Sequence, residues 1–109
     1  MARETGKDGF QRRLIERLEK LFPGCFILKN DTSYLQGVPD LIILYEDKWA
    51  MLEVKASVTS LPEPNQPYYV ATLNAMSYAA FVYPENVEDV LNALQHTFRP
   101  DGTPRVPVG

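Results

Sequence analysis

The sequence contains a single cysteine, Cys25, and a single histidine, His96, among its 109 residues. One cysteine cannot form a disulfide within the chain, and it cannot build a zinc site of the cysteine-rich kind. No apolar run approaches membrane-spanning length, and the first residues show no signal-peptide pattern, so we expect a soluble, cytoplasmic protein. A chain of this length is expected to form one domain around one hydrophobic core.

The chain also lacks an excess of basic residues. Its 11 lysines and arginines are outnumbered by 14 acidic residues, which gives a formal net charge of -3. Proteins that bind nucleic acid are usually basic, because they neutralise phosphate groups. Bound divalent cations would offset part of the acidic excess, and acids that bind metal are counted within it. The composition therefore does not exclude nucleic-acid binding.

The hydrophobic pattern predicts helices and strands in a mixed α/β order. Apolar residues at helical spacing predict a first helix over residues 8–22, which Pro23-Gly24 ends. The remaining predicted elements are strands at 25–28, 41–45 and 49–55, a helix from Asn65-Gln66-Pro67 to Met76, a strand at 79–83, and a helix with Asn86 as its N-cap. The order is therefore α-β-β-β-α-β-α. Residues 1–98 are predicted to form the domain, and residues 99–109, rich in proline and glycine, a disordered tail.

Charged residues stand at the open end of the central predicted hairpin. The segment Gly-Val-Pro-Asp, residues 37–40, precedes the first strand, and Glu53-Val54-Lys55 ends the second. Because side chains alternate along a strand, Glu53 and Lys55 share one face while Val54 points to the other. Burying such charges without partners is costly, so their position indicates a metal ion or a substrate.

Pro39-Asp40 followed by Glu53-Val54-Lys55 resembles the motif of the PD-(D/E)xK, or restriction-endonuclease-like, nuclease superfamily. The predicted element order matches the minimal core of that superfamily, a central mixed sheet flanked by helices. Residues 8–94 are most similar to small VRR-NUC-type and Holliday-junction-resolvase-like domains. In these, a Gly-x-Pro-Asp-Leu-Ile segment leads to a Glu-Val-Lys strand and then to a helix headed by glutamine, here Gln66. The resemblance implies a magnesium-dependent DNA endonuclease.

The resemblance also implies a role for each motif residue. Asp40 and Glu53 are expected to bind Mg²⁺, or Mn²⁺ in its place, with the backbone carbonyl of Val54 as a third ligand. The cation would neutralise charge on the phosphorus and activate a water. Lys55 would hold that water or stabilise the developing negative charge, and its role as a base stays open. Gln66 would position a water or a phosphate oxygen, although an exposed polar residue at a helix start fits equally well.

Gln11 stands where the superfamily commonly has a glutamate on its first helix. The helical wheel places it close to Leu14 and Leu18, so it is predicted to face inward. Two compatible roles remain open: a site role through its amide oxygen, or a capping box with Asp8 as N-cap. Without a charge at this position, affinity for a second metal ion would be weaker.

Residues outside the motif are candidates for contact with nucleic acid. Lys29, Asn30 and Tyr34 lie in the polar loop that leads to Asp40, and Arg12 lies on the polar side of the first helix. DNA, either duplex or structured, is the expected partner. A domain this small has little room for base-reading loops, which favours selection of junctions, flaps or nicks by structure. A homodimer would suit such a role, because its two sites could cut two strands.

Three classes of function remain open. The first is an active endonuclease, which the intact Asp40, Glu53 and Lys55 favour. The second is a nucleic-acid-binding module whose catalysis has weakened, which Gln11 favours. The third is a protein-interaction domain that uses the fold as a scaffold, and the acidic net charge is its main support.

Overall fold

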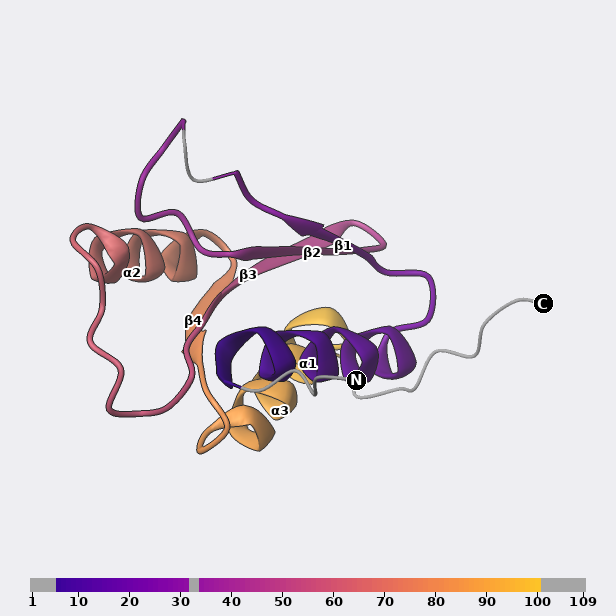
Figure 1. Cartoon of the computed structure of the whole chain (residues 1–109). Coiled ribbons are helices and arrows are strands. Elements are labelled where there is room, and N and C mark those ends of the chain that lie inside the picture. The colour runs from indigo at the N-terminus through magenta and orange to yellow at the C-terminus, as the bar shows by residue number, and fades with distance from the viewer. Residues whose placement is uncertain (1–5, 32–33, 101–109) are drawn as a thin grey trace.

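The computed structural model describes residues 6–31 and 34–100, and the statements below concern these residues. The elements follow the predicted order α-β-β-β-α-β-α (Figure 1). Their bounds are α1 Gly6–Leu21, β1 Phe26–Lys29, β2 Leu41–Tyr45, β3 Lys48–Val54, α2 Gln66–Met76, β4 Tyr78–Val82 and α3 Val87–Phe98. No helix in this part of the chain is long and apolar enough to span a membrane.

The strands form one mixed sheet in the order β1-β2-β3-β4, which confirms the predicted architecture. The pairs β1/β2 and β2/β3 are antiparallel, whereas β3 and β4 are parallel and are connected through α2. Within the β2/β3 hairpin, Leu41 pairs with Leu52. The register therefore brings the next residues along, Asp40 before β2 and Glu53 near the end of β3, to the same end of the hairpin.

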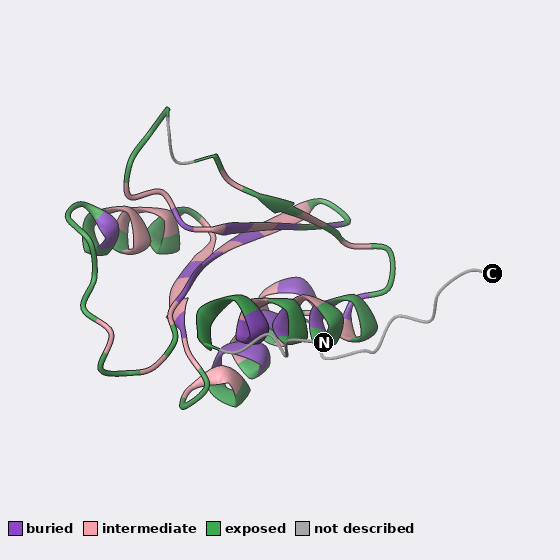
Figure 2. Ribbon diagram, viewed as in Figure 1, coloured by how far each residue is buried: buried purple, intermediate pink, exposed green. Residues whose placement is uncertain are grey.

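The hydrophobic core lies between the sheet and the pair α1 and α3, while α2 packs on the opposite face (Figure 1). Alternate residues of β2 and β3 point into this core because strand side chains alternate between the two faces. These alternate residues are fully or almost fully buried: Leu41, Ile43, Tyr45, Ala50, Leu52 and Val54. In Figure 2 most of the buried residues, in purple, lie on the sheet and on the helices α1 and α3 that pack against it.

The start of α1 corrects one prediction. The helix begins at Gly6, so Asp8 lies inside its first turn and is not an N-cap. The predicted capping box between Asp8 and Gln11 is therefore wrong, because both residues are already helical. Asp8 still lies where a negative charge interacts favourably with the helix dipole.

Asn86 is the N-cap of α3, as predicted, but its side chain makes no capping hydrogen bond to the helix. Its Oδ1 accepts a hydrogen bond from the Tyr83 backbone N–H at 2.9 Å, and its Nδ2 donates to the Phe81 carbonyl at 3.0 Å. The side chain thus fastens the end of β4 to the start of α3. The position was predictable from residue type, whereas the partners depend on the preceding turn.

The folded region includes Arg99, one residue beyond the boundary predicted at residue 98. The Arg99 guanidinium donates to the Leu21 carbonyl at 2.5 Å and lies 5.1 Å from the centre of the Phe22 ring. This contact fastens the end of α3 to the end of α1. Of the predicted tail, residues 101–109 lie outside the described residues.

Candidate functional site

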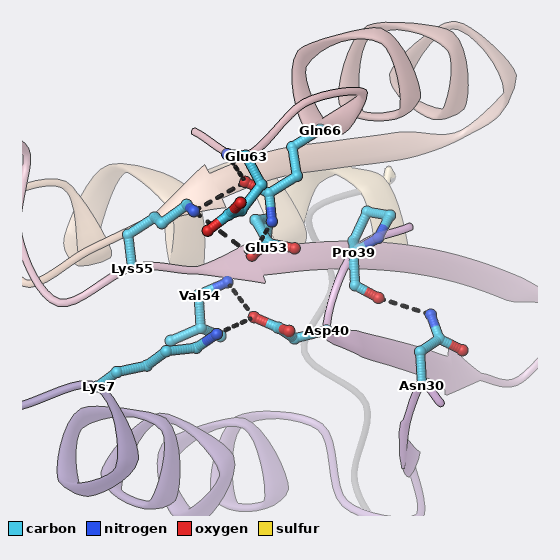
Figure 3. A network of polar contacts seen from close by, with 9 residues as sticks. All are labelled: Lys7, Asn30, Pro39, Asp40, Glu53, Val54, Lys55, Glu63 and Gln66. Carbon is cyan, nitrogen blue, oxygen red and sulfur yellow. Dashed lines mark hydrogen bonds and ion pairs between the residues drawn. The ribbon is translucent and has the colours of Figure 1, made fainter. Parts of the chain in front are cut away.

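Asp40 is fixed at the open end of the β2/β3 hairpin by two donors. Its Oδ2 accepts a hydrogen bond from the Val54 backbone N–H at 3.0 Å and lies 3.0 Å from the Lys7 Nζ (Figure 3). The Asp40 side chain keeps 19% of its surface exposed, so it is partly open to solvent. The hairpin register and the backbone of β3 together determine where this charge lies.

Glu53 is a buried carboxylate, with only 1% of its surface exposed. Its Oε2 accepts a hydrogen bond from the Gln66 Nε2 at 3.0 Å and lies 3.9 Å from the Lys55 Nζ. Its other oxygen, Oε1, is buried and has no hydrogen-bond partner among the described residues. Leaving a buried carboxylate oxygen unpaired costs free energy, so this atom is a candidate ligand for a cation.

The protonation equilibrium of Glu53 reflects this environment. Burial, and after it the negative charge of Asp40, raise the pKa of Glu53 from 4.5 to about 7. Lys7 and Lys55 act in the opposite direction but do not cancel the rise. A divalent cation between the two carboxylates would favour the ionised form.

Gln66, the first residue of α2, connects Glu53 near the end of β3 with Lys55, the residue after the strand. Its Oε1 accepts hydrogen bonds from the Lys55 Nζ at 2.8 Å and from the Glu63 backbone N–H at 2.7 Å, while its Nε2 donates to Glu53. Only 8% of its surface is exposed. The alternative of an exposed polar residue at a helix start is therefore wrong, and Gln66 holds the Lys55 ammonium beside the Glu53 carboxylate (Figure 3).

The loop before Asp40 packs directly on the first turn of α2. Gly37 has a φ of +94°, and a Cβ there would lie 2.8 Å from the Asn65 Cβ and 3.2 Å from the Tyr69 Cδ2. Only glycine fits such a close approach without displacing the helix. Because residue 37 is glycine, α2 can lie close enough to the loop for Gln66 to contact Lys55 and Glu53.

Lys7 is the site residue that the sequence analysis missed. It lies in the first turn of α1 and reaches Asp40 from the opposite side to α2 (Figure 3). Lys7 and Gln11 are four residues apart, so they share one face of the helix. Extending the inward face found at Gln11 by one turn would have indicated Lys7.

Three other candidate residues, Gln11, Arg12 and Lys29, line one hollow of about 530 Å³. Asp8, Ile15 and Glu16 complete its lining, so the hollow lies between α1 and the end of β1. In the described part of the chain, no hydrogen bond or ion pair joins Gln11 to Asp40 or Glu53. Gln11 therefore lines this polar hollow, and its site role stays a prediction.

Asn30 and Tyr34 differ sharply in their surroundings. The Asn30 Nδ2 donates to the Pro39 carbonyl at 2.6 Å, and its backbone N–H donates to the Asp40 carbonyl at 2.8 Å. Asn30 thus fixes the loop on which Asp40 stands. Tyr34 is 91% exposed and is available for contact with a partner.

The carboxylates present fit one hard divalent cation. Within residues 6–31 and 34–100, no group of three or more His, Cys, Asp or Glu side chains is arranged to hold a metal. Asp40 and Glu53 nevertheless supply oxygen ligands, and the Glu53 Oε1 has no other partner in this part of the chain. Mg²⁺ prefers oxygen and often keeps several waters, so two carboxylates are sufficient for one ion.

Two solved structures resemble most of the chain. A solved structure titled "VRR_NUC domain" has a TM-score of 0.67 and 24% sequence identity, and covers 82% of this chain and 97% of that chain. A second, titled "VRR_NUC domain protein", has a TM-score of 0.64 and 19% identity, and covers 96% of this chain and 100% of that chain. No protein-family model and no curated protein matches the sequence. The chain has the fold of these VRR_NUC domain structures, as predicted.

Proposed function

We propose that this chain, which has the fold of VRR_NUC domain structures, is a magnesium-dependent endonuclease that hydrolyses phosphodiester bonds of DNA. The observation that carries the proposal is the Glu53 Oε1, a buried carboxylate oxygen without a hydrogen-bond partner in the described residues. It lies beside the Asp40 carboxylate, whose charge raises the pKa of Glu53. A divalent cation between these two carboxylates would give the Glu53 Oε1 a partner, and the fold is that of VRR_NUC domain structures.

Asp40 and Glu53 would hold Mg²⁺, or Mn²⁺ in its place, with the Val54 carbonyl as a further ligand. The bound cation would neutralise charge on the phosphate and activate a water at neutral pH. The protein prepares this site by fixing Asp40 on the Val54 N–H and Glu53 on the Gln66 amide. Both ligands are therefore oriented before any ion binds.

Lys55 would stabilise the negative charge that develops during cleavage. Its ammonium is 12% exposed and is held by the Gln66 Oε1 at 2.8 Å, so it is confined to one position. A fixed positive charge in a site largely shielded from water stabilises a transition state more strongly than a mobile one does. Gln66 acts as the positioning residue for this charge.

The hollow lined by Gln11, Arg12 and Lys29 is where we propose that the DNA backbone lies. Lys29 is the last residue of β1 and pairs with Leu41, the residue that follows Asp40. Lys29 therefore lies close to the backbone of Asp40. Basic groups beside a cleavage site neutralise phosphates locally, even where the net charge of the chain is negative. The small size of the domain favours selection of DNA structure over base sequence.

A homodimer would give the enzyme two sites for the two strands of a duplex or a junction. Three exposed apolar side chains support this proposal: Phe26, Leu28 and Leu44 are 68%, 48% and 38% exposed. Phe26 pairs with Leu44 across β1 and β2, and α2 packs over β3 and β4 instead. This face of β1 and β2 is therefore available to a second copy.

A nucleic-acid-binding module with weakened catalysis is the second candidate. The observation that favours it is the absence, in the described residues, of a third acid near Asp40 and Glu53. Gln11 can supply only an uncharged oxygen. This candidate predicts salt-sensitive DNA binding without cleavage.

The direct test is a cleavage assay with Mg²⁺ or Mn²⁺ on single-stranded, duplex, flapped and four-way-junction DNA. Lys55→Ala is expected to lower the rate by roughly a hundredfold or more, because it removes a charge that acts in the transition state. Lys48→Ala is the matched control, since Lys48 begins the same strand and pairs with the Asp47 carboxylate in the turn. Failure to cut any substrate with either metal, or equal rates for wild type and Lys55→Ala, would exclude the proposed enzyme.

A further inference from the structure

Both carboxylates of the site already have a lysine beside them. The Lys7 Nζ lies 3.0 Å from the Asp40 Oδ2, and the Lys55 Nζ lies 3.9 Å from the Glu53 Oε2. When both carboxylates are ionised, two negative and two positive charges balance in this arrangement. A divalent cation that enters between the carboxylates adds two positive charges next to two ammonium groups, and such like charges repel strongly at these distances.

Lys55 is not free to withdraw from an incoming cation. Its side chain is 12% exposed, and its ammonium donates to the buried Gln66 amide. Lys7 differs in both respects. Its side chain is 43% exposed, and its ion pair is with the partly exposed Asp40 carboxylate. An ion pair this open to solvent contributes little free energy, so Lys7 can swing into solvent at small cost.

Asp40 itself would not move when Lys7 leaves. Its Oδ2 also accepts the backbone N–H of Val54 at 3.0 Å, and that donor is fixed by the sheet. The carboxylate therefore keeps its orientation, and a cation can take the place of the ammonium without rearrangement of the hairpin. Lys7 and the cation compete for the same negative charge.

We propose that Lys7 is a resident competitor for the metal site: its ammonium pairs with Asp40 until a divalent cation displaces it, and this sets the metal affinity of the site. The inference rests on the proposed function, because it requires Asp40 to be a metal ligand. In the metal-free protein, Lys7 balances the charge of Asp40 next to the buried Glu53. Only cations that offer more than one positive charge would displace it readily.

Binding of Mn²⁺ to the free protein, followed by electron paramagnetic resonance without nucleic acid, tests this inference. Lys7→Met is expected to bind Mn²⁺ about threefold to tenfold more tightly than wild type, because the competing charge is gone. Lys7→Arg keeps the charge and should bind no more tightly than wild type. Lys20→Met is the matched control, since Lys20 lies in the last turn of the same helix, about 20 Å from Lys7 at 1.5 Å per residue.

The outcomes separate this inference from the proposed function. Mn²⁺ binding by wild type with an equal or weaker affinity in Lys7→Met would overturn the role of Lys7 and leave the metal site in place. No Mn²⁺ binding by any of the four proteins would overturn both. As a second readout, Mn²⁺ should raise the melting temperature of Lys7→Met more than that of wild type, and a smaller rise would count against the inference.

Discussion

At the scale of single residues, Glu53 is a carboxylate buried to 1% exposure beside a second carboxylate, Asp40. Its pKa is raised from 4.5 to about 7 in the folded protein, first by burial and then by the charge of Asp40. The folded state therefore binds this proton more tightly than the unfolded state does. Between these two pKa values the metal-free protein loses stability as the pH rises, because ionised Glu53 is tolerated better in the unfolded chain.

We therefore expect metal-free wild type to lose up to about 3 kcal/mol relative to Glu53→Gln between pH 5 and pH 8. Denaturant unfolding of both proteins in the presence of a chelator, at several pH values, measures the difference. Glu19→Gln is a suitable control, because Glu19 is exposed on α1. Parallel stability profiles for wild type and Glu53→Gln would show that Glu53 does not ionise at an unfavourable site.

The residue scale also shows what the sequence could reveal about the site. Asp40, Glu53 and Lys55 lie together because hairpin register and strand alternation, both readable from sequence, determine their positions. Lys7 was missed because the predicted helix began at residue 8, one residue after it, whereas α1 begins at Gly6. The helical pattern could indicate the face on which Lys7 lies, but its contact with Asp40 depends on how α1 packs beneath the sheet.

At the scale of elements, the spacing of apolar residues and the positions of helix-ending and turn residues were sufficient to predict every helix and strand in the right order. The errors fall at the ends. Predicted strand 25–28 runs instead over Phe26–Lys29, and α1 begins at Gly6, before the residue expected to cap it. Element ends depend on hydrogen bonds to neighbouring segments, such as that from the Asn30 backbone N–H to the Asp40 carbonyl, which apolar spacing does not report.

Substitution of Gly37 tests whether the contact between its loop and α2 positions the residues of the site. Gly37→Ala would strain a φ of +94° and press the new methyl group against Asn65 and Tyr69 at the start of α2. Gly24→Ala is a close control, because Gly24 has a φ of +89° but nothing within 4 Å of the added carbon. We expect Gly37→Ala to lose about 1–3 kcal/mol more stability than Gly24→Ala in denaturant unfolding, since the helix must shift.

The same shift would carry Gln66 away from Lys55 and Glu53. We therefore expect folded Gly37→Ala to cleave DNA more slowly than Gly24→Ala under conditions where both are fully native. Equal stability losses in the two variants would mean that backbone strain alone matters at Gly37. The contact between the loop and α2 would then not position the site.

At the scale of the whole molecule, the sheet is covered unevenly. α1 and α3 enclose one face, and α2 covers β3 and β4 on the other, so β1 and the neighbouring part of β2 stay open (Figure 2). Phe26, Leu28 and Leu44 lie on this open face. They extend toward the β2/β3 turn, at the end of the hairpin opposite to Asp40. Two copies joined through this face would leave both candidate sites accessible to DNA.

Phe26→Ser is therefore expected to convert a homodimer into a monomer, because it places a polar group at the centre of an apolar contact. Phe26 is 68% exposed, so the substitution should cost the monomer little stability. Leu61→Ser is the matched control, since Leu61 is 86% exposed in the connector before α2. Sedimentation velocity at micromolar concentrations measures all three proteins. A monomeric wild type, or a Phe26→Ser variant that remains dimeric, would exclude this face as the interface.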